Sequence, residues 1–326
     1  MLFPPPTMPS SKPSTSEPIS LTRLKLALHL TPHIGERTLV YVLRRLVVER
    51  MSPSEFLSLH PDVWTSEFAL KQEAADALAD QKDALLKASE VLSQALRLHG
   101  IALLTLGETG YPARLEQNDA APPPLLYALG NLSLLSPASQ KEPPHFTFAL
   151  ALSNNPTPEA LEKQDEIART LALAGGIAVT GHDRLPYQRL ALSLQRLNKP
   201  TLYVLDKGIR KAMKSHFEAP LFPAARIRET EFEKTRDLVI SPFRPDDDTL
   251  APHSLRRRDR LIFALADVIV AVDVNPSGGM FTECKIALKA GRAVFVAEGG
   301  RDGNQKLRAL GAKALDLHPL FASQLF

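Results

Sequence analysis

Apolar residues along the chain change their spacing at about residues 98 and 146, and these changes divide the sequence into segments. From residue 21 to residue 98, apolar side chains recur every three or four positions, as in LTRLKLALHL (residues 21–30). This spacing is typical of amphipathic helices. It predicts a small helical domain over residues 21–98, with TPHIG (residues 31–35) as a turn between two of its helices.

Two further segments differ from this domain in composition. Residues 1–20 are rich in Pro and Ser and lack the apolar stretch of a signal peptide, so we expect a disordered tail. Residues 99–145 contain two short strand-like runs on either side of a triple proline, followed by the linker-like sequence SPASQKEPPH. We interpret residues 99–145 as a connector that joins the helical domain to the rest of the chain.

From residue 146 to residue 326, short apolar runs alternate with amphipathic stretches of helical length. The runs are FTFALAL, GIAVTG, TLYVLD, DLVIS, DVIVAVD and AVFVAE. Continuous apolar runs separated by helices are typical of a parallel sheet covered on both faces. Gly175 and Gly291 each stand between a helix and the next run, where helix C-caps are expected. The predicted fold class is therefore α/β: an extended Rossmann-like, doubly wound, mostly parallel sheet over residues 146–326, preceded by the small helical domain.

The composition is that of an ordinary globular protein. The 326 residues are 44% hydrophobic and carry a formal net charge of +3, so affinity for an acidic partner has to come from local clusters. Cys284 is the single cysteine, which excludes an intramolecular disulfide and a cysteine-based zinc site. His29 and His33 are separated by Pro32, which is expected to end the helix that paired ligands would need, so we expect no metal and no cofactor. The longest apolar run, LIFALADVIVAV, is too short to span a bilayer, and we expect a cytoplasmic protein without a membrane partner.

A block of four arginines, Arg256, Arg257, Arg258 and Arg260, precedes that apolar run. In a doubly wound sheet, ligands bind at the carboxyl ends of the strands, and there the block is expected to begin a helix. With Ser254 as the N-cap, the first arginines would occupy the first turn, where the helix dipole disfavours each cation by about 0.3–1 kcal/mol. This position favours a role in anion binding. The alternative is that the arginines are solvated, or paired with the acidic sequence PDDD (residues 245–248).

A second candidate is NPSGG, which follows an apolar run and opens a helix. Exposed backbone N–H groups at Gly278 and Gly279, together with the hydroxyl of Ser277, can bind a phosphate. The alternative is a tight turn that needs glycine only for its backbone angles. We expect this loop and the arginines to share one edge of the sheet.

Three weaker candidates remain. Lys207 and Lys211 lie on what is most simply a solvated helix face, and with Arg184 they would extend a basic track along a nucleic-acid backbone. His182 and Asp183 are a candidate acid/base pair, but adjacent side chains point in different directions and no Ser or Cys nucleophile accompanies them. TPHIGERT is similar to a helix-hairpin-helix turn, which binds backbone phosphates.

Four ordered motifs resemble the DprA/Smf family of DNA-processing proteins. They are YPARLEQNDAAPPPLLYALGN, LRRRDRLIFALADVIVAVD, SGGMFTECKIALKAGRAVFV and GNQKLRALGA, and the resemblance covers most of the chain from about residue 21. It implies an extended Rossmann fold behind a helical domain of the SAM or helix-hairpin-helix kind, a basic pocket for single-stranded DNA, and a homodimer. It also implies a RecA-type recombinase as partner in natural transformation, and no catalysis.

The resemblance also assigns residues. The family's Arg-Arg-Asn-Arg sequence is similar to RRDR (residues 257–260), and its Ser-Gly-Ser sequence is similar to Ser277–Gly279. The chain departs from the family where Gly-Ser-Arg is replaced by Ser153–Asn155 and where the loop after the second run is shortened to TGHDRLPYQ. No winged-helix motif follows GAKALDLHPLF. These departures indicate a divergent member.

Two other classes stay open. PSGGMFTE is similar to the Pro-Gly-Gly-x-Gly-Thr-x-x-Glu loop of LOG-type nucleoside-monophosphate phosphoribohydrolases, with Thr282 in the place of the threonine but Lys285 in the place of the catalytic glutamate. Release of free base from a nucleoside monophosphate would support that enzyme. The third class is a degenerate fold that serves as a protein-interaction platform and binds no DNA.

Overall fold

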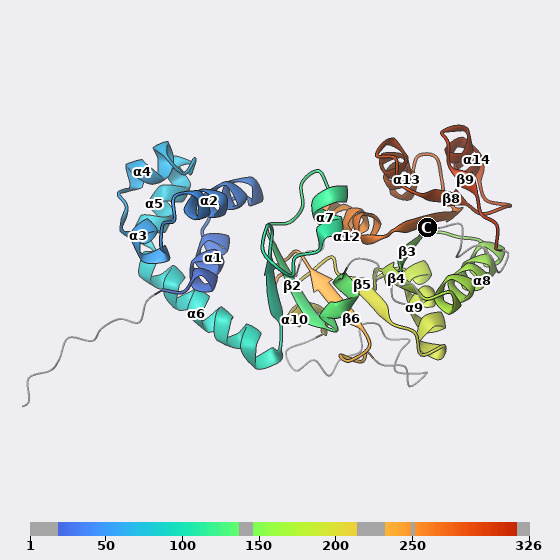
Figure 1. The fold of residues 1–326 in the computed structure, drawn as a ribbon, viewed down its shortest axis with the longest axis horizontal. Coiled ribbons are helices and arrows are strands. Elements are labelled where there is room, and N and C mark those ends of the chain that lie inside the picture. The colour runs from blue at the N-terminus through green and yellow to red at the C-terminus, as the bar shows by residue number, and fades with distance from the viewer. Residues whose placement is uncertain (1–18, 137–145, 214–231, 249–251, 318–326) are drawn as a thin grey trace, which may run out of the picture. The chain divides into compact units, whose positions relative to one another are not determined.

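The structure is a computed structural model that describes residues 19–136, 146–213, 232–248 and 252–317. The predicted tail up to residue 18 and the predicted linker at residues 137–145 lie outside these ranges. The chain divides into two compact units between Ala95 and Leu96. Figure 1 labels most of the helices and strands of both units.

The first unit is built from short amphipathic helices, which confirms the helical region predicted ahead of the sheet. These are α1 (Leu21–Leu30), α2 (Glu36–Val48), α3 (Pro53–Ser58), α4 (Pro61–Ser66), α5 (Gln72–Asp80) and α6 (Lys82–His99), the last of which passes the division between the units. Side chains next to the first turn cap the N-termini of several of these helices. At α3, for example, Ser52 and Glu55 form a capping box. The buried indole of Trp64 donates a hydrogen bond to the carbonyl of Phe56 at 2.9 Å, which joins α4 to α3 in the core of the unit.

The second unit contains one nine-stranded sheet and the helices that cover it. Its first elements are β1 (Ala102–Thr105), α7 (Ala113–Asn118), β2 (Leu125–Gly130) and the 3-10 helix η1 (Leu132–Leu135). Next come β3 (Phe146–Leu152), α8 (Pro158–Leu173), β4 (Gly176–Thr180), α9 (Leu185–Arg196), β5 (Thr201–Val204), α10 (Ile209–Met213) and β6 (Leu238–Ser241). The last are α12 (Pro252–Leu265), β7 (Val268–Asp273), α13 (Gly279–Lys289), β8 (Val294–Val296), α14 (Asp302–Ala309) and β9 (Lys313–Ala314).

The strand order is β1-β2-β6-β5-β4-β3-β7-β8-β9. In this order, every neighbouring pair from β6 across the sheet to β9 is parallel. Strand β2 pairs antiparallel with both β6 and β1. The predicted doubly wound, mostly parallel sheet is therefore confirmed. After β3 the chain winds outward through β4 and β5, and after β7 it winds the other way, so the order reverses between β3 and β7. Ligands of such sheets bind outside the carboxyl ends of the strands at this reversal.

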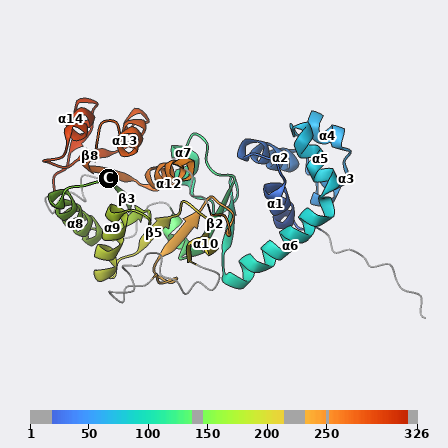
Figure 2. The ribbon, with the colours of Figure 1, turned by 180° about the vertical axis from the view of Figure 1, so that it is seen from behind.

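Helices cover both faces of the sheet, which explains why the strand sequences are continuously apolar. Phe146, Phe148 and Leu150 of β3 pack with residues of α8 and α9, whereas the small Ala149 and Ala151 lie in the other core, with α12 and α13. Figures 1 and 2 show the two helical layers from opposite sides. The C-cap residues of α8 and α13 are Ala174 and Ala290, and Gly175 and Gly291 follow them with φ angles of 92° and 73°. Both helices therefore end at the predicted glycines, each one residue past the cap.

At the amino edge of the sheet, two arginines bind the C-terminal end of α12 and Asp267, which follows it. Asp267, the one acid within the longest apolar run, accepts hydrogen bonds from Arg114 of α7 at 2.7 and 2.9 Å and from the backbone N–H of Thr147 at 2.8 Å. Arg292 donates to the carbonyl oxygens of Phe263 (2.6 Å) and Ala266, at the C-terminal end of α12. Because α12 is fixed at this end, the position of its opposite end at the carboxyl edge is fixed as well.

The start of α12 differs from the sequence prediction. The helix includes Pro252, so Ser254 is a buried residue of the first turn and its prediction as N-cap is wrong. Proline suits the first turn of a helix because its missing N–H would have no partner there. Arg256 and Arg257 consequently follow the first turn, where the dipole penalty is weaker than the sequence argument assumed.

Candidate nucleic-acid interface

Arg258 lies at the centre of the carboxyl edge and is fully buried. It forms an ion pair with Asp183 from the loop after β4, and its Nε donates to Oδ1 of Asp259 at 2.9 Å. Its guanidinium also lies 5.0 Å from the ring centroid of Tyr187. Burial alone would lower the pKa of Arg258, but the acidic groups of Tyr187, Asp259 and Asp183 reverse this effect and raise it. Arg258 is therefore a permanently charged residue of the interior.

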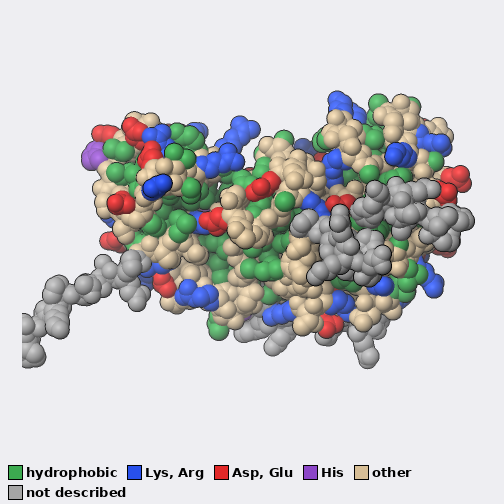
Figure 3. Space-filling model, viewed as in Figure 1, with side chains coloured by type: hydrophobic (Ala, Val, Ile, Leu, Met, Phe, Trp, Pro, Cys, Tyr) green, Lys and Arg blue, Asp and Glu red, His purple; other side chains and the backbone are tan. Residues whose placement is uncertain are grey.

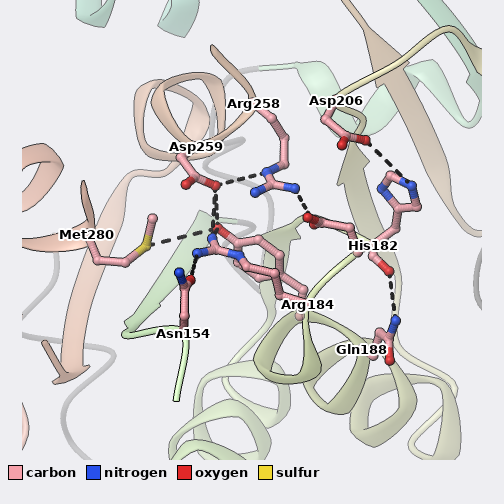
Figure 4. A network of polar contacts seen from close by, with 10 residues as sticks. Asn154, His182, Arg184, Gln188, Asp206, Arg258, Asp259 and Met280 are labelled. Atoms are coloured by element: carbon pink, nitrogen blue, oxygen red, sulfur yellow. Dashed lines mark hydrogen bonds and ion pairs between the residues drawn. The ribbon is translucent and has the colours of Figure 1, made fainter. Parts of the chain in front are cut away.

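Arg184, the N-cap residue of α9, joins a loop and two helices at the same edge (Figure 4). Its guanidinium donates to Oδ1 of Asn154 at 2.6 Å and to Asp259 at 3.0 Å, and it also contacts the hydroxyl of Tyr187. Tyr187 in turn donates to Asp259 at 2.7 Å. Asp259 is thus the shared acceptor of Arg184, Arg258 and Tyr187. The network connects the loop after β3, the start of α9 and the second turn of α12.

The other arginines of the block, Arg256, Arg257 and Arg260, lie outside the network of Arg184 and Arg258. Arg260 binds the buried carboxylate of Asp119 through Nε at 2.6 Å and the carbonyl of Ala121 at 3.0 Å. Arg257 is half-buried and Arg256 is exposed. The structure therefore brings Arg184 and Arg258 into one network, whereas Arg260 is tied to the segment that follows α7.

The acidic sequence PDDD binds another group of cations instead of the arginine block. Lys211 of α10 lies 3.0 Å from Asp248, and Lys207, in the loop after β5, lies 4.0 Å from the same carboxylate. Arg210 pairs with Asp246 at 3.2 Å. The alternative that PDDD neutralises the arginines is not supported by any ion pair among the described residues. Lys207 and Lys211 are instead gathered beside Asp248.

The NPSGG loop leaves the N-terminus of α13 open. Asn275 accepts hydrogen bonds from the N–H (3.1 Å) and the hydroxyl (3.0 Å) of Ser277, and its own N–H donates to the hydroxyl of Ser153 at 2.7 Å. Gly278 is the N-cap and therefore supplies no side-chain oxygen for the first N–H groups of the helix. A Cβ atom at Gly279 would meet nothing within 4 Å. Gly279, the first residue of α13, is therefore exposed, whereas Met280 and Phe281 of the same turn are buried.

His182 and Asp183 face different partners, as expected for adjacent residues. Nε2 of His182 lies 3.7 Å from Oδ1 of Asp206, at the end of β5, while Asp183 binds Arg258. Burial lowers the pKa of His182, and the negative charge of Asp206 only partly opposes this effect. The pair that the structure forms is His182 with Asp206, and not the candidate pair of the sequence.

Glu283 on α13 is a half-buried carboxyl group close to the network. Burial and, to a lesser extent, the charge of Asp259 raise its pKa to about 7, although Arg260 opposes the shift. Glu283 therefore changes its charge near neutral pH, one turn beyond Gly279.

Replacement Glu283→Gln is expected to stabilise the protein by about 1 kcal/mol at pH 8 and to have no such effect near pH 5. The pKa of the folded state lies above the ordinary value of 4.5, so protonation favours folding, and stability of the natural protein falls as pH rises from 4.5 to about 7. Glutamine keeps the shape of the neutral acid, and partial exposure limits the gain. Urea denaturation at both pH values measures it; equal gains at the two values would contradict the assignment.

Sequence reasoning identified the cations of this edge but not their partners. Tyr187 and Asp119 were not identified, because a single Tyr or Asp at the end of a helix forms no motif. Their partners Arg258 and Arg260 are more than seventy residues away in the chain. Asn154 was noted as a departure from a family motif, and its contact with Arg184 depends on the tertiary fold.

The fold and this edge define a doubly wound α/β protein with polar loops gathered at the carboxyl ends of its strands. The family model of DNA recombination-mediator protein A matches residues 102–317, which is more than half of the chain. The chain therefore belongs to this family, and the resemblance seen in the sequence is confirmed.

Two solved structures agree with this assignment in their fold. The X-ray structure of DNA processing protein A from Streptococcus pneumoniae is 18% identical, with a TM-score of 0.71, and the match covers 93% of this chain and 98% of that one. DNA processing protein A from Helicobacter pylori, described for its single-stranded DNA binding mode, is 19% identical with a TM-score of 0.52, over 69% of this chain and 95% of that one. No curated protein matched the sequence. Among the described residues, no helix is long and apolar enough to cross a membrane, and no cluster of three or more His, Cys, Asp or Glu side chains is arranged to bind a metal.

Proposed function

We propose that this protein binds single-stranded DNA at the carboxyl edge of its sheet and acts, without catalysis, as an accessory protein of a RecA-type recombinase. Membership of the recombination-mediator family supports the proposal, as does the single-stranded DNA binding mode described for the Helicobacter pylori relative. We extend the proposal to a cytoplasmic homodimer. Sedimentation velocity tests the dimer, and co-purification with a RecA-type recombinase in the presence and absence of oligonucleotide tests the partner.

The observation that supports this function best is the open N-terminus of α13. The first N–H groups of a helix lack intrahelical acceptors and lie at the positive end of the helix dipole, so they bind phosphate well. Here the N-cap residue is Gly278, which has no side chain to cap them, and within the described part of the chain nothing lies within 4 Å of a Cβ atom placed at Gly279. Ser277 is exposed at the same place and adds a hydroxyl group.

The cations of the edge divide into two roles in this proposal. The first role is phosphate binding, which we assign to residues that are at least partly accessible: Arg257, Lys207, Lys211, Ser277, Gly278 and Gly279. The carboxylate of Asp248 that pairs with both lysines is itself partly exposed. Three other arginines are bound to carboxylates of the protein and position the elements of the edge: Arg184, Arg258 and Arg260.

Binding should favour single-stranded over double-stranded oligonucleotides and weaken steeply with salt. Each phosphate contact on a single strand contributes about −0.7 to the slope of log affinity against log salt concentration, so four contacts give a slope of about −3. Fluorescence anisotropy with a labelled oligo(dT) of about 30 nucleotides, at several salt concentrations, measures both quantities. Absence of binding by the folded protein at low salt would overturn the proposal in favour of an interaction platform. Release of free base from a nucleoside monophosphate would indicate the phosphoribohydrolase.

A double variant locates the contacts. Arg257→Ala with Lys211→Ala should make the salt slope shallower by about 1.4, which corresponds to two lost phosphate contacts. The control removes two exposed charges from the outer surfaces of α8 and α9, Arg169→Ala with Arg196→Ala. An equal change in both variants would show that only the net charge matters and not this edge.

A further inference from the structure

One face of α2, in the first unit, combines two arginines with an aromatic ring. Arg37, Tyr41, Arg44 and Val48 follow one another at intervals of four, three and four residues, so their side chains lie within an arc of about 60° on the helix. All four are exposed, and Tyr41 retains 43% of its accessible surface. The acidic residue of this helix, Glu36, lies about 140° from Tyr41 around the axis. We call Arg37, Tyr41, Arg44 and Val48 the α2 face.

The two arginines of the α2 face differ from Arg45, their neighbour on the same helix. Within the described residues, neither Arg37 nor Arg44 forms an ion pair, whereas their neighbour Arg45 binds both Glu49 (2.5 Å) and Glu67 (2.6 Å). Figure 3 shows Lys and Arg side chains on the surface over α2. The arrangement therefore presents positive charge that the surrounding structure does not neutralise.

The aromatic ring between these cations is held in place. The hydroxyl of Tyr41 donates to the carbonyl of Glu67 at 3.4 Å and accepts a hydrogen bond from Arg45 at 3.3 Å. Both partners bind the hydroxyl end of the side chain, so the ring is fixed while its surface stays accessible. An accessible Tyr has little cost in conformational entropy when it stacks on a ligand, because few rotations remain to be lost.

Exposed aromatic rings flanked by cations match the chemistry of single-stranded nucleic acid. Every base offers a face for stacking, which contributes about 1–3 kcal/mol, and the phosphates on either side bind arginine. Arg37 and Arg44 are about 10 Å apart along the helix axis, and their long side chains can reach the phosphates that flank one stacked base. An acidic peptide would bind the same arginines but would have no flat group for Tyr41.

We propose that the α2 face is a second binding site for single-stranded nucleic acid, in which the ring of Tyr41 stacks on a base and Arg37 and Arg44 bind the adjacent phosphates. The inference rests on the proposed function for the class of ligand, but it assigns a contact to the helical unit, separate from the sheet edge. Val48 adds an apolar surface beside the stacked base.

Charge reversal on the α2 face is the first test. In the full-length chain, Arg37→Glu with Arg44→Glu should weaken binding of a labelled oligo(dT) of about 30 nucleotides by about tenfold and make the salt slope shallower by about 1.4. The matched control, Lys71→Glu with Lys87→Glu, makes the same charge change at two exposed residues of the same unit and should weaken binding by less than about threefold. Thermal unfolding verifies that each variant folds, which is expected because all four side chains are exposed.

A fluorescent residue reports on the α2 face directly. Tyr41→Trp places an exposed indole beside the arginines, while the native Trp64 is buried and cannot stack on a base. Titration with oligo(dT) should quench this emission with the same midpoint as the anisotropy change, because a stacked base quenches indole.

The outcomes separate the two proposals. Equal losses in the two charge-reversal variants, or binding of the oligonucleotide without quenching of the Trp at position 41, would overturn the α2 site and leave binding at the sheet edge intact. Absence of any oligonucleotide binding would overturn both. Quenching together with a selective loss in the Arg37/Arg44 variant supports the α2 site even if the variants of the sheet edge bind normally.

Discussion

Replacement of Arg258 by alanine is expected to destabilise the folded protein by about 3–5 kcal/mol, which is the usual cost of breaking a buried ion pair by removing one partner. The side chain is 1% exposed, and its loss leaves Asp183 and Asp259 without their buried counter-charge beside the ring of Tyr187. It also leaves a cavity, because water has no access to the space that the guanidinium fills.

Urea denaturation measures this effect, with Arg256→Ala as the control. Arg256 belongs to the same helix but is exposed, so its loss should change stability by no more than about 0.5 kcal/mol. Arg258→Lys should recover only part of the loss, since an ammonium group cannot reproduce the planar contacts with Asp183, Asp259 and the ring. Equal stability of Arg258→Ala and Arg256→Ala would show that the ion pairs of Arg258 do not support the fold.

Gly279→Asp is expected to weaken the binding of single-stranded DNA by at least about tenfold, or about 1.4 kcal/mol, without loss of stability. An acid in the first turn interacts favourably with the dipole of α13, and a Cβ atom at this position meets no neighbour. The new carboxylate would, however, occupy and repel the phosphate site. The variant thus separates binding from folding.

Gly279→Ala is the matched control for this prediction. It adds the same Cβ atom without charge, so the affinity for oligo(dT) should stay within about threefold of the natural protein. Anisotropy titrations measure affinity, and thermal unfolding measures stability. If Asp and Ala at this position bind DNA equally well, the N-terminus of α13 does not bind phosphate.

The two tests address different parts of one edge. Arg258 was singled out in the sequence as a phosphate ligand, yet the structure saturates it with Asp183 and Asp259. The N-cap of α13, Gly278, by contrast makes no side-chain cap hydrogen bond, and Gly279 after it is exposed. A run of arginines in a sequence does not reveal which of them face the interior. This depends on how the helix is rotated about its axis and on acidic residues far away in the chain.

Much of the fold was determined by the sequence alone. The run FTFALAL can be buried only between two helical layers, and it became β3, whose alternate residues pack into the two cores. The six strands predicted from Phe146 onward, and the helix ends at Gly175 and Gly291, follow from local patterns because burial and backbone angles are local requirements. The position of the NPSGG loop before a helix follows for the same reason.

Tertiary structure decided which charges meet. It paired Arg260 with Asp119 and Arg258 with Asp183, and it brought Asp248 to Lys207 and Lys211. It also started α12 at Pro252, two residues before the predicted N-cap. Side-chain ion pairs depend on separations of a few ångströms between segments far apart in the chain, and hydrophobic periodicity carries no information about those separations. The sequence therefore determined the sheet and the edge at which we propose that DNA binds, and only the three-dimensional arrangement determined which cations of that edge are accessible.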